Sequence, residues 1–162
     1  MKILVNRSQR LHRQFIVEEA LKRGFETWAA VRKGSSRRYL QDSRIRFVEL
    51  DFDNPVGLRE RLSGIGFDYV VHAAGATKCL HASDFFRINT QGTKNLAAAV
   101  AATCPGLRRF VFISSLSVSG PVRETVPYTD ITAADTPRPD TAYGRQQARG
   151  RAHARRMAAS PS

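Results

Sequence analysis

The chain has 162 residues and a formal net charge of +12, from 26 Lys and Arg against 14 Asp and Glu. This length suits one domain with a sizeable core and excludes a second full domain. A hydrophobic fraction of 42% with 25% charged residues excludes a disordered chain. The apolar runs are too short to cross a bilayer and the start lacks a signal-peptide core, so we expect no membrane span and a cytoplasmic location. Cys79 and Cys104 lack metal-ligand spacing; we expect free thiols and no metal site.

The excess positive charge is concentrated in two stretches without any acidic residue. Residues 6–14 carry three arginines and residues 146–162 carry four, which together make seven of the twelve net charges. The second stretch has no large apolar side chain except Met157, so we expect a disordered tail or an irregular helix. It also lacks the interleaved aromatic residues of a single-strand binder. A solvated charged tail is therefore the favoured interpretation, and nucleic acid is not expected as a partner.

Apolar runs alternate with amphipathic segments along the rest of the chain. Short runs that are apolar on both faces indicate buried parallel strands, and apolar residues at helical spacing indicate helices. Strands alternating with helices predict an α/β fold with a doubly wound parallel sheet, for which we expect the strand order 3-2-1-4-5. In chain order we predict strand 1–5, helix 15–24, strand 25–31, strand 45–50, helix 56–62, strand 68–72, helix 84–103, strand 109–114 and a loop over 121–140.

Four motifs from Asp68 onward follow one another as they do in a known protein family. They read VVHAAGATK, INTQGTKNL, FVFISSLSVSG and TPRPDTAYGR. Over residues 1–5 and 15–145, the chain resembles the extended short-chain dehydrogenase/reductase family, whose members are also called NAD-dependent epimerase/dehydratases. The resemblance implies an NAD(P)-binding Rossmann domain over residues 1–145 and oxidoreductase, epimerase or dehydratase chemistry by hydride transfer. It also implies that the sheet is truncated after about the fifth strand and that the family's C-terminal substrate domain is absent.

Two motifs of this family are missing at the positions where they are expected. The glycine-rich turn T-G-x-x-G-x-x-G falls on residues 6–13, which contain no glycine, and the lysine of Tyr-x-x-x-Lys falls on Gln147. When residues 6–14 are back-translated with permitted codons and the codons are read one base later, they give T-G-A-S-G-F-I-G. The same shift applied to the stretch from residue 146 permits a reading with a lysine at position 147. We therefore hypothesise that residues 6–14 and 146–162 are frame-shifted, the second shift ending the chain early. Side chains in place of the glycines would crowd a pyrophosphate, so we expect weak cofactor binding.

The resemblance assigns acid/base catalysis to Tyr143 and a hydrogen bond to the substrate oxygen to Ser115. In the family, the tyrosine exchanges a proton with the substrate while hydride moves to or from the nicotinamide. A free tyrosine has a pKa of about 10, so a lysine cation is needed beside it to stabilise the phenolate. Gln147 is neutral, and we expect this chain to be catalytically defective. The alternative interpretation gives both residues a structural role. Tyr143 would then be an ordinary loop tyrosine, and the Ser115 hydroxyl would hydrogen-bond the backbone at the end of a strand.

The ends of the second and third strands supply candidates for binding the adenosine part of the cofactor. By resemblance, Asp51 accepts a hydrogen bond from the adenine amino group and Phe52 lies beside the ring, although Asp51 could instead cap the next helix. NAD-preferring members present an acid after the second strand, whereas this chain presents Arg32 in the basic sequence AAVRKGSSRR. Arginine and serine suit a 2′-phosphate, so we expect NADP to be preferred slightly over NAD, with a solvated basic loop as the alternative.

The fourth strand and the helix after it supply the remaining candidates. Ala73, Ala74 and Gly75 are small residues at the strand end, where they would let the cofactor approach or the next helix pack tightly. By resemblance, Asn89 supports the geometry of the active site. His72 lies within an apolar strand end, so we predict a buried, hydrogen-bonded histidine without a catalytic role.

Three functions follow from these patterns. The favoured one is an NAD(P)-dependent enzyme by ancestry whose chain is catalytically defective; the others are a non-catalytic fragment that binds a nucleotide or another subunit, and a basic nucleic-acid-binding protein. The resemblance implies a small-molecule substrate, which could be a sugar nucleotide, an aldehyde or ketone, or a sterol, and homodimers for full-length relatives. Because missing strands expose a sheet edge and apolar surface, we also expect poor solubility.

Overall fold

One parallel sheet organises the protein, and its strand order is the one predicted. The computed structural model describes residues 1–7, 10–38, 40–73, 75–76, 81–121, 127 and 130–159. Five strands run in the order β3-β2-β1-β4-β5, and all neighbours are parallel. The α/β class is thereby confirmed. The strands are β1 (Lys2–Arg7), β2 (Glu26–Val31), β3 (Arg46–Glu49), β4 (Tyr69–Ala73) and β5 (Arg109–Phe112).

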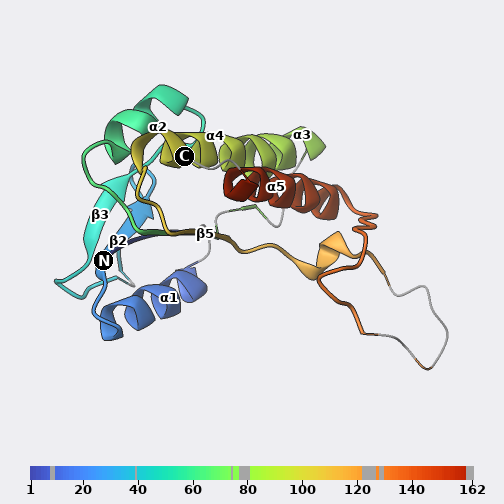
Figure 1. Ribbon diagram of the computed structural model, residues 1–162, viewed down its shortest axis with the longest axis horizontal. Helices are drawn as coiled ribbons and strands as arrows, with labels where there is room; N and C mark the ends of the chain where they lie inside the picture. The colour runs from blue at the N-terminus through green and yellow to red at the C-terminus, as the bar shows by residue number, and fades with distance from the viewer. Residues whose placement is uncertain are drawn as a thin grey trace.

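Helices cover both faces of the sheet (Figure 1). One face is covered by α1 (Arg10–Lys22), and the other by α2 (Pro55–Leu62), α4 (Gly92–Thr103) and α5 (Ala142–Ala159). The helix predicted over 84–103 is present, but it has three parts: the short helix α3 (Ala82–Phe85), the π-helix η1 (Phe86–Gln91) and α4. A single 3₁₀ turn, η2 (Leu116–Val118), follows β5.

The core consists of two apolar layers, one on each side of the sheet. Successive residues of a strand point to opposite faces, so Leu4 packs with Leu58 and Val100 of the α2–α4 layer, and Val5 packs with Val17 of α1. All five side chains are fully buried. Because both faces are covered by helices, the strands read as continuous apolar runs.

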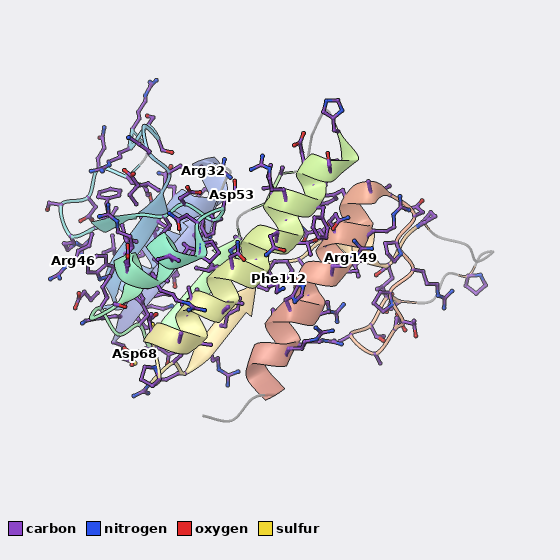
Figure 2. The ribbon with its side chains drawn as sticks, turned by 90° about the horizontal axis from the view of Figure 1, so that it is seen from above. Arg32, Arg46, Asp53, Asp68, Phe112 and Arg149 are labelled. Atoms are coloured by element: carbon purple, nitrogen blue, oxygen red, sulfur yellow. The ribbon has the colours of Figure 1, made fainter. Side chains whose placement is uncertain are left out.

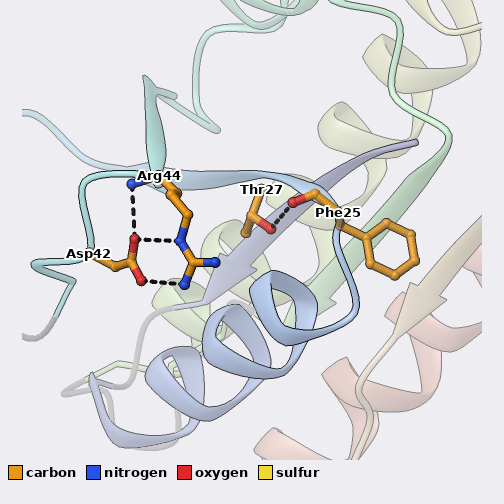
Figure 3. Close-up of polar contacts among 4 residues, drawn as sticks. All are labelled: Phe25, Thr27, Asp42 and Arg44. Carbon is orange, nitrogen blue, oxygen red and sulfur yellow. Dashed lines mark hydrogen bonds and ion pairs between the residues drawn. The ribbon is translucent and has the colours of Figure 1, made fainter.

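Local polar contacts lie just before β3 and at the start of β2 (Figure 3). The Asp42 carboxylate accepts hydrogen bonds from the Arg44 backbone N–H at 2.9 Å and from its guanidinium Nε and Nη2 at 3.0 and 2.7 Å. These bonds lower the pKa of Asp42 to about 2. Thr27 Oγ1 donates to the Phe25 carbonyl oxygen at 3.0 Å where β2 begins. The Asp42–Arg44 contacts hold the turn just before β3, and the Thr27–Phe25 bond holds the start of β2.

Residues 146–159 continue α5 as a regular helix, where the sequence analysis expects a disordered or irregular tail. The buried side of α5 includes two glycines and Gln147. A Cβ on Gly144 would overlap the Ser117 carbonyl oxygen, and one on Gly150 would lie 2.9 Å from Phe112 Cζ. The expectation considered only large apolar side chains, but glycine lets the helix backbone itself approach its neighbours.

The outer edge of the sheet is open at β5. In the described part of the chain, β5 pairs with β4 alone. Val111 is 43% exposed and Ile113 is 40% exposed on the side of the sheet away from α5, and Leu116 is 75% exposed. This is the exposed edge and apolar surface on which the solubility prediction depends. None of the described helices is both long enough and apolar enough to cross a membrane.

Candidate functional site

A cavity of about 520 Å³ lies at the carboxyl ends of β2 and β3. Its walls come from the residues after these strands, from α2, and from η1 and the start of α4. Three of the predicted site residues line it: Arg32, Asp51 and Phe52. Figure 2 shows Arg32 and Asp53, another wall residue, at the same end of the sheet. The carboxyl edge of a parallel sheet is where α/β proteins bind nucleotides.

The hydrogen bonds of Asp51 and Phe52 leave the Asp51 carboxylate and the Phe52 ring able to contact a ligand. Asp51 Oδ1 accepts from the Asp53 backbone N–H at 3.0 Å, and its side chain is otherwise exposed. It does not cap α2, because Asn54 does so by accepting from the Gly57 N–H at 2.9 Å. Phe52 is half-buried, and its carbonyl oxygen accepts from Asn95 Nδ2 at 2.8 Å.

The cavity carries four cationic and four anionic side chains. Sequence reasoning identified Arg32 and Asp51 but missed the side chains that come from the helices, such as Arg61 and Arg87, because side chains that converge only in space leave no local signal. Arg87 of η1 pairs with Asp53 and, at 4.0 Å, with Asp84. The cations are Arg32, Lys33, Arg61 and Arg87, and the anions are Glu49, Asp51, Asp53 and Glu60.

His72 closes the inner end of the cavity and is buried and hydrogen-bonded, as predicted. Its Nδ1 lies 2.9 Å from Asn6 Nδ2, which can only donate, so Nε2 carries the proton and donates to Thr93 Oγ1 at 2.8 Å. Thr93 Oγ1 in turn donates to the Asn89 carbonyl oxygen at 2.6 Å. Burial lowers the pKa of His72 to about 4, so the ring is neutral near pH 7.

A second group of predicted residues lies where α5 begins. Tyr143 is half-buried, and its ring centroid is 6.1 Å from that of Phe85. Ser115 caps η2: its Oγ accepts from the Ser117 N–H at 3.2 Å and donates to Ser117 Oγ at 3.1 Å. The close contact of Gly144 with the Ser117 carbonyl brings the start of α5 against η2. Both residues are therefore near this junction, although the hydroxyl of Ser115 is bonded to its own turn.

Gln147 lies one helical turn after Tyr143 and is only 4% exposed. Its Oε1 has no hydrogen-bond partner among the described residues. A Cβ on Gly75 would lie 3.5 Å from Gln147 Nε2 and 3.1 Å from Asn89 Oδ1. Asn89 accepts from the Ala76 N–H at 2.7 Å and donates to its carbonyl at 2.9 Å, so it holds the loop after β4.

Some residues named in the sequence analysis lie outside the described part of the chain, so the expectations for them are not tested. Ala73 is the last residue of β4, but Ala74 lies outside the described residues. The turn between β1 and α1 includes residues 8 and 9, which also lie outside them, as does Cys79; Cys104 is a buried free thiol. Within the described ranges, no group of three His, Cys, Asp or Glu could hold a metal ion.

Solved structures of similar fold include the UDP-Glc/GlcNAc 4-epimerase from Campylobacter jejuni, with a TM-score of 0.81 and 20% identity, over 98% of this chain and 49% of that one. WbmG from Bordetella bronchiseptica, in complex with NAD and UDP, has a TM-score of 0.79 and 22% identity, over 96% of this chain and 49% of that one. MoeE5, in complex with UDP-glucose and NAD, has a TM-score of 0.78 and 23% identity, over 99% and 50%. The chain thus spans about half the length of these proteins. No curated protein matches it.

A family model matches residues 14–161. The match leaves out the glycine-free segment near the N-terminus and runs through residues 146–161, which the frameshift hypothesis treats as foreign to the family. It covers most of the chain. The chain belongs to the NAD dependent epimerase/dehydratase family.

Proposed function

We propose that this chain binds a nicotinamide dinucleotide along the carboxyl edge of the sheet, with the adenosine part in the cavity. The observation that carries the proposal is that Asp51 and Phe52 come together on one wall of a cavity at this edge. The exposed Asp51 carboxylate can accept a hydrogen bond from the adenine amino group, and the Phe52 ring can contact the base. The adenosine part therefore fits the residues present.

The other end of the proposed site fits less well. The small residue Gly75 leaves room beside Asn89 that a side chain would fill. The buried Gln147 Oε1, which has no partner among the described residues, can accept a hydrogen bond from a ligand hydroxyl or amide. Gln147 cannot supply the positive charge that a lysine would place there. At the nicotinamide end, the ligand would therefore contact small residues and the Gln147 amide, but it would meet no positive charge at position 147.

The chemistry of the proposed site is proton transfer by Tyr143 at a substrate carbinol or carbonyl. The dinucleotide would supply the hydride acceptor or donor. Tyr143 exchanges the proton, and Ser115 bonds the substrate oxygen once its hydroxyl turns away from Ser117. With a neutral residue at position 147, nothing at this position stabilises the tyrosinate, so we propose that turnover is severely impaired. A sugar nucleotide is the substrate class we propose for the whole protein, since the similar structures from Bordetella and MoeE5 contain UDP or a UDP-sugar.

Removing the Asp51 carboxylate is expected to weaken NAD binding. A hydrogen bond to a charged acceptor contributes about 1.5–3 kcal/mol, so Asp51→Ala should raise the Kd for NAD roughly 10- to 100-fold. Calorimetric titration measures the effect. Asp42→Ala is the matched control, because Asp42 is an aspartate outside the cavity. Equal affinity of Asp51→Ala and the unmodified chain would contradict the proposed position of adenine.

We also propose that Arg32 and Lys33 bind a 2′-phosphate, so that NADP binds somewhat more tightly than NAD. The structures of WbmG and MoeE5 contain NAD and give no support to this preference. Glu49 on the same cavity wall suits a ribose hydroxyl instead, and would oppose a phosphate. Arg32→Ala is therefore expected to weaken NADP about tenfold and to leave NAD nearly unchanged, as measured by competition binding. An equal loss for both dinucleotides would show that Arg32 does not contact the 2′ position.

A further inference from the structure

Four polar side chains, here called the polar row, lie buried between the end of β1 and the loop after β4. Asn6 comes from β1, His72 from β4, Thr93 from α4 and Asn89 from η1. None of the four is more than 3% exposed. Burying a polar group costs free energy unless the group is hydrogen-bonded, so each member of the row depends on its neighbours.

The hydrogen bonds of the polar row all run in one direction, and Asn89 sets it. Its carbonyl oxygen can only accept, so the Thr93 hydroxyl, 2.6 Å away, gives it its single proton. Thr93 Oγ1 can then only accept from His72, and Nε2, at 2.8 Å, is the ring nitrogen that carries the proton. The other ring nitrogen, Nδ1, accepts from Asn6 Nδ2 at 2.9 Å. Donor and acceptor are therefore matched at every step.

Aromatic side chains surround the ring of His72 without offering hydrogen bonds to its nitrogens. The ring centroid lies 6.2, 6.0 and 5.6 Å from those of Phe52, Phe110 and Phe112; Figure 2 labels Phe112. Burial lowers the pKa of His72 to about 4, so the ring keeps a single proton near pH 7. Among the described residues, the two bonds of the polar row are thus the polar contacts that orient this ring.

The polar row ends at the loop after β4. Asn89 Oδ1 accepts from the Ala76 backbone N–H at 2.7 Å, and Asn89 Nδ2 donates to the Ala76 carbonyl oxygen at 2.9 Å. A Cβ on Gly75 would lie 3.1 Å from the same Oδ1, so the loop packs closely against this side chain. Asn89 thus belongs to the row through its backbone carbonyl and holds the loop through its carboxamide.

We propose that His72 and Thr93 are positioning residues of the dinucleotide site. Because His72 donates to Thr93, the Thr93 proton is directed to the Asn89 carbonyl, and Asn89 in turn holds the loop after β4, where the ligand would cross the sheet. The ligand part of this inference rests on the proposed function, whereas the state of the loop is a property of the ligand-free chain. His72 has no catalytic role in this arrangement, since its ring proton stays within the row.

Hydrogen exchange at the Ala76 backbone N–H, followed by nuclear magnetic resonance in the ligand-free chain, tests the polar row. Thr93→Val keeps the side-chain volume but removes the hydroxyl, so the Asn89 carbonyl and the His72 N–H lose their partner and Ala76 should exchange about tenfold faster. Thr93→Ser keeps the hydroxyl and should stay within about threefold of the unmodified chain. Thr27→Val is the matched control and should leave Ala76 unchanged, because Thr27 is also fully buried and donates to a backbone carbonyl, at 3.0 Å, but near the start of β2.

A double variant tests whether His72 acts through Thr93. His72→Leu should speed exchange at Ala76 about as much as Thr93→Val does, and the double variant should exceed neither, because all three interrupt the same row. Multiplied effects in the double variant would show that the two residues act separately and would overturn the proposal, as would unchanged exchange in Thr93→Val. The buried Val5 N–H in β1 reports global stability, and an equal acceleration there would reduce the effect to general destabilisation and overturn the proposal as well.

Titration with ADP and with NAD tests the ligand part separately. ADP would reach only the adenosine end, so Thr93→Val should leave its Kd within about twofold, whereas the Kd for NAD should rise about fivefold. Equal losses for the two ligands would contradict a role at the loop. If the unmodified chain binds neither ligand, the proposed function fails, while the exchange at Ala76 still shows whether the polar row holds the loop.

Discussion

Replacing Gln147 by lysine is expected to destabilise the ligand-free chain by several kcal/mol. Gln147 is 4% exposed. The ammonium of a lysine at this position would lose its hydration, and the residues described beside it, Asn89 and Gly75, offer no carboxylate to pair with it. The effective penalty for burying an unpaired ion is of the order of several kcal/mol. The substitution should also increase the stabilisation gained from NAD, because the new cation can bond the ligand and stabilise a tyrosinate at Tyr143. Denaturant unfolding with and without NAD measures both effects.

Gln147→Met is the matched control for this prediction. Methionine fills a similar volume and removes the amide oxygen that lacks a partner among the described residues. A buried acceptor without a hydrogen bond costs about 1–3 kcal/mol, so the methionine variant should be as stable as the unmodified chain or more stable. It should gain nothing from NAD beyond what the unmodified chain gains. If lysine is tolerated without loss and adds nothing to NAD binding, position 147 lies outside the proposed site.

Acid is expected to destabilise the fold through His72. Its pKa is lowered from 6.5 to about 4 by burial, so between these values the unfolded chain binds a proton that the folded chain does not. The stabilisation is fully present above about pH 6.5 and is lost as the pH falls toward 4, with a total of about 3 kcal/mol. Denaturant unfolding at about pH 7 and about pH 4.5 measures most of this change.

The His72 contribution can be separated from that of the carboxylates. A glutamine at this position keeps an amide that can accept from Asn6 and donate to Thr93, but it does not titrate. His72→Gln should therefore remove most of the pH dependence between 6.5 and 4, whereas His153→Gln, at a partly exposed site with a pKa lowered in the same direction, should remove little. If His72→Gln retains the full pH dependence, the acid sensitivity has another source.

Much of the fold follows from local sequence patterns. Apolar runs such as those around Leu4 and Val70 are bounded by turn residues, which indicates short strands. Because these strands are apolar on both faces, helices must cover both faces of the sheet, and this predicts a parallel α/β sheet. His72 was predicted to be buried because its neighbours in the strand are apolar. The π-helical segment around Asn89 carries no comparable signal, since its residues suit an α-helix equally well.

The parts that could not be predicted depend on contacts across the fold. Helix α5 packs through Gly144 and Gly150, whose contribution appears only when their neighbours Ser117 and Phe112 are known. The cavity is completed by side chains such as Arg61, which reach it from helices distant in sequence. The positive charge of residues 146–159 is visible in the sequence, but the regular helix α5 that carries it is not.

The central claim is that the adenosine end of the site is complete and the nicotinamide end is not. Calorimetric titration of the unmodified chain with ADP and with NAD tests it most directly. Because the nicotinamide end adds few contacts, the two ligands should bind with Kd values within about tenfold of one another. NAD bound more than about 100-fold more tightly than ADP would contradict the claim, because that end would then contribute more than about 2.7 kcal/mol.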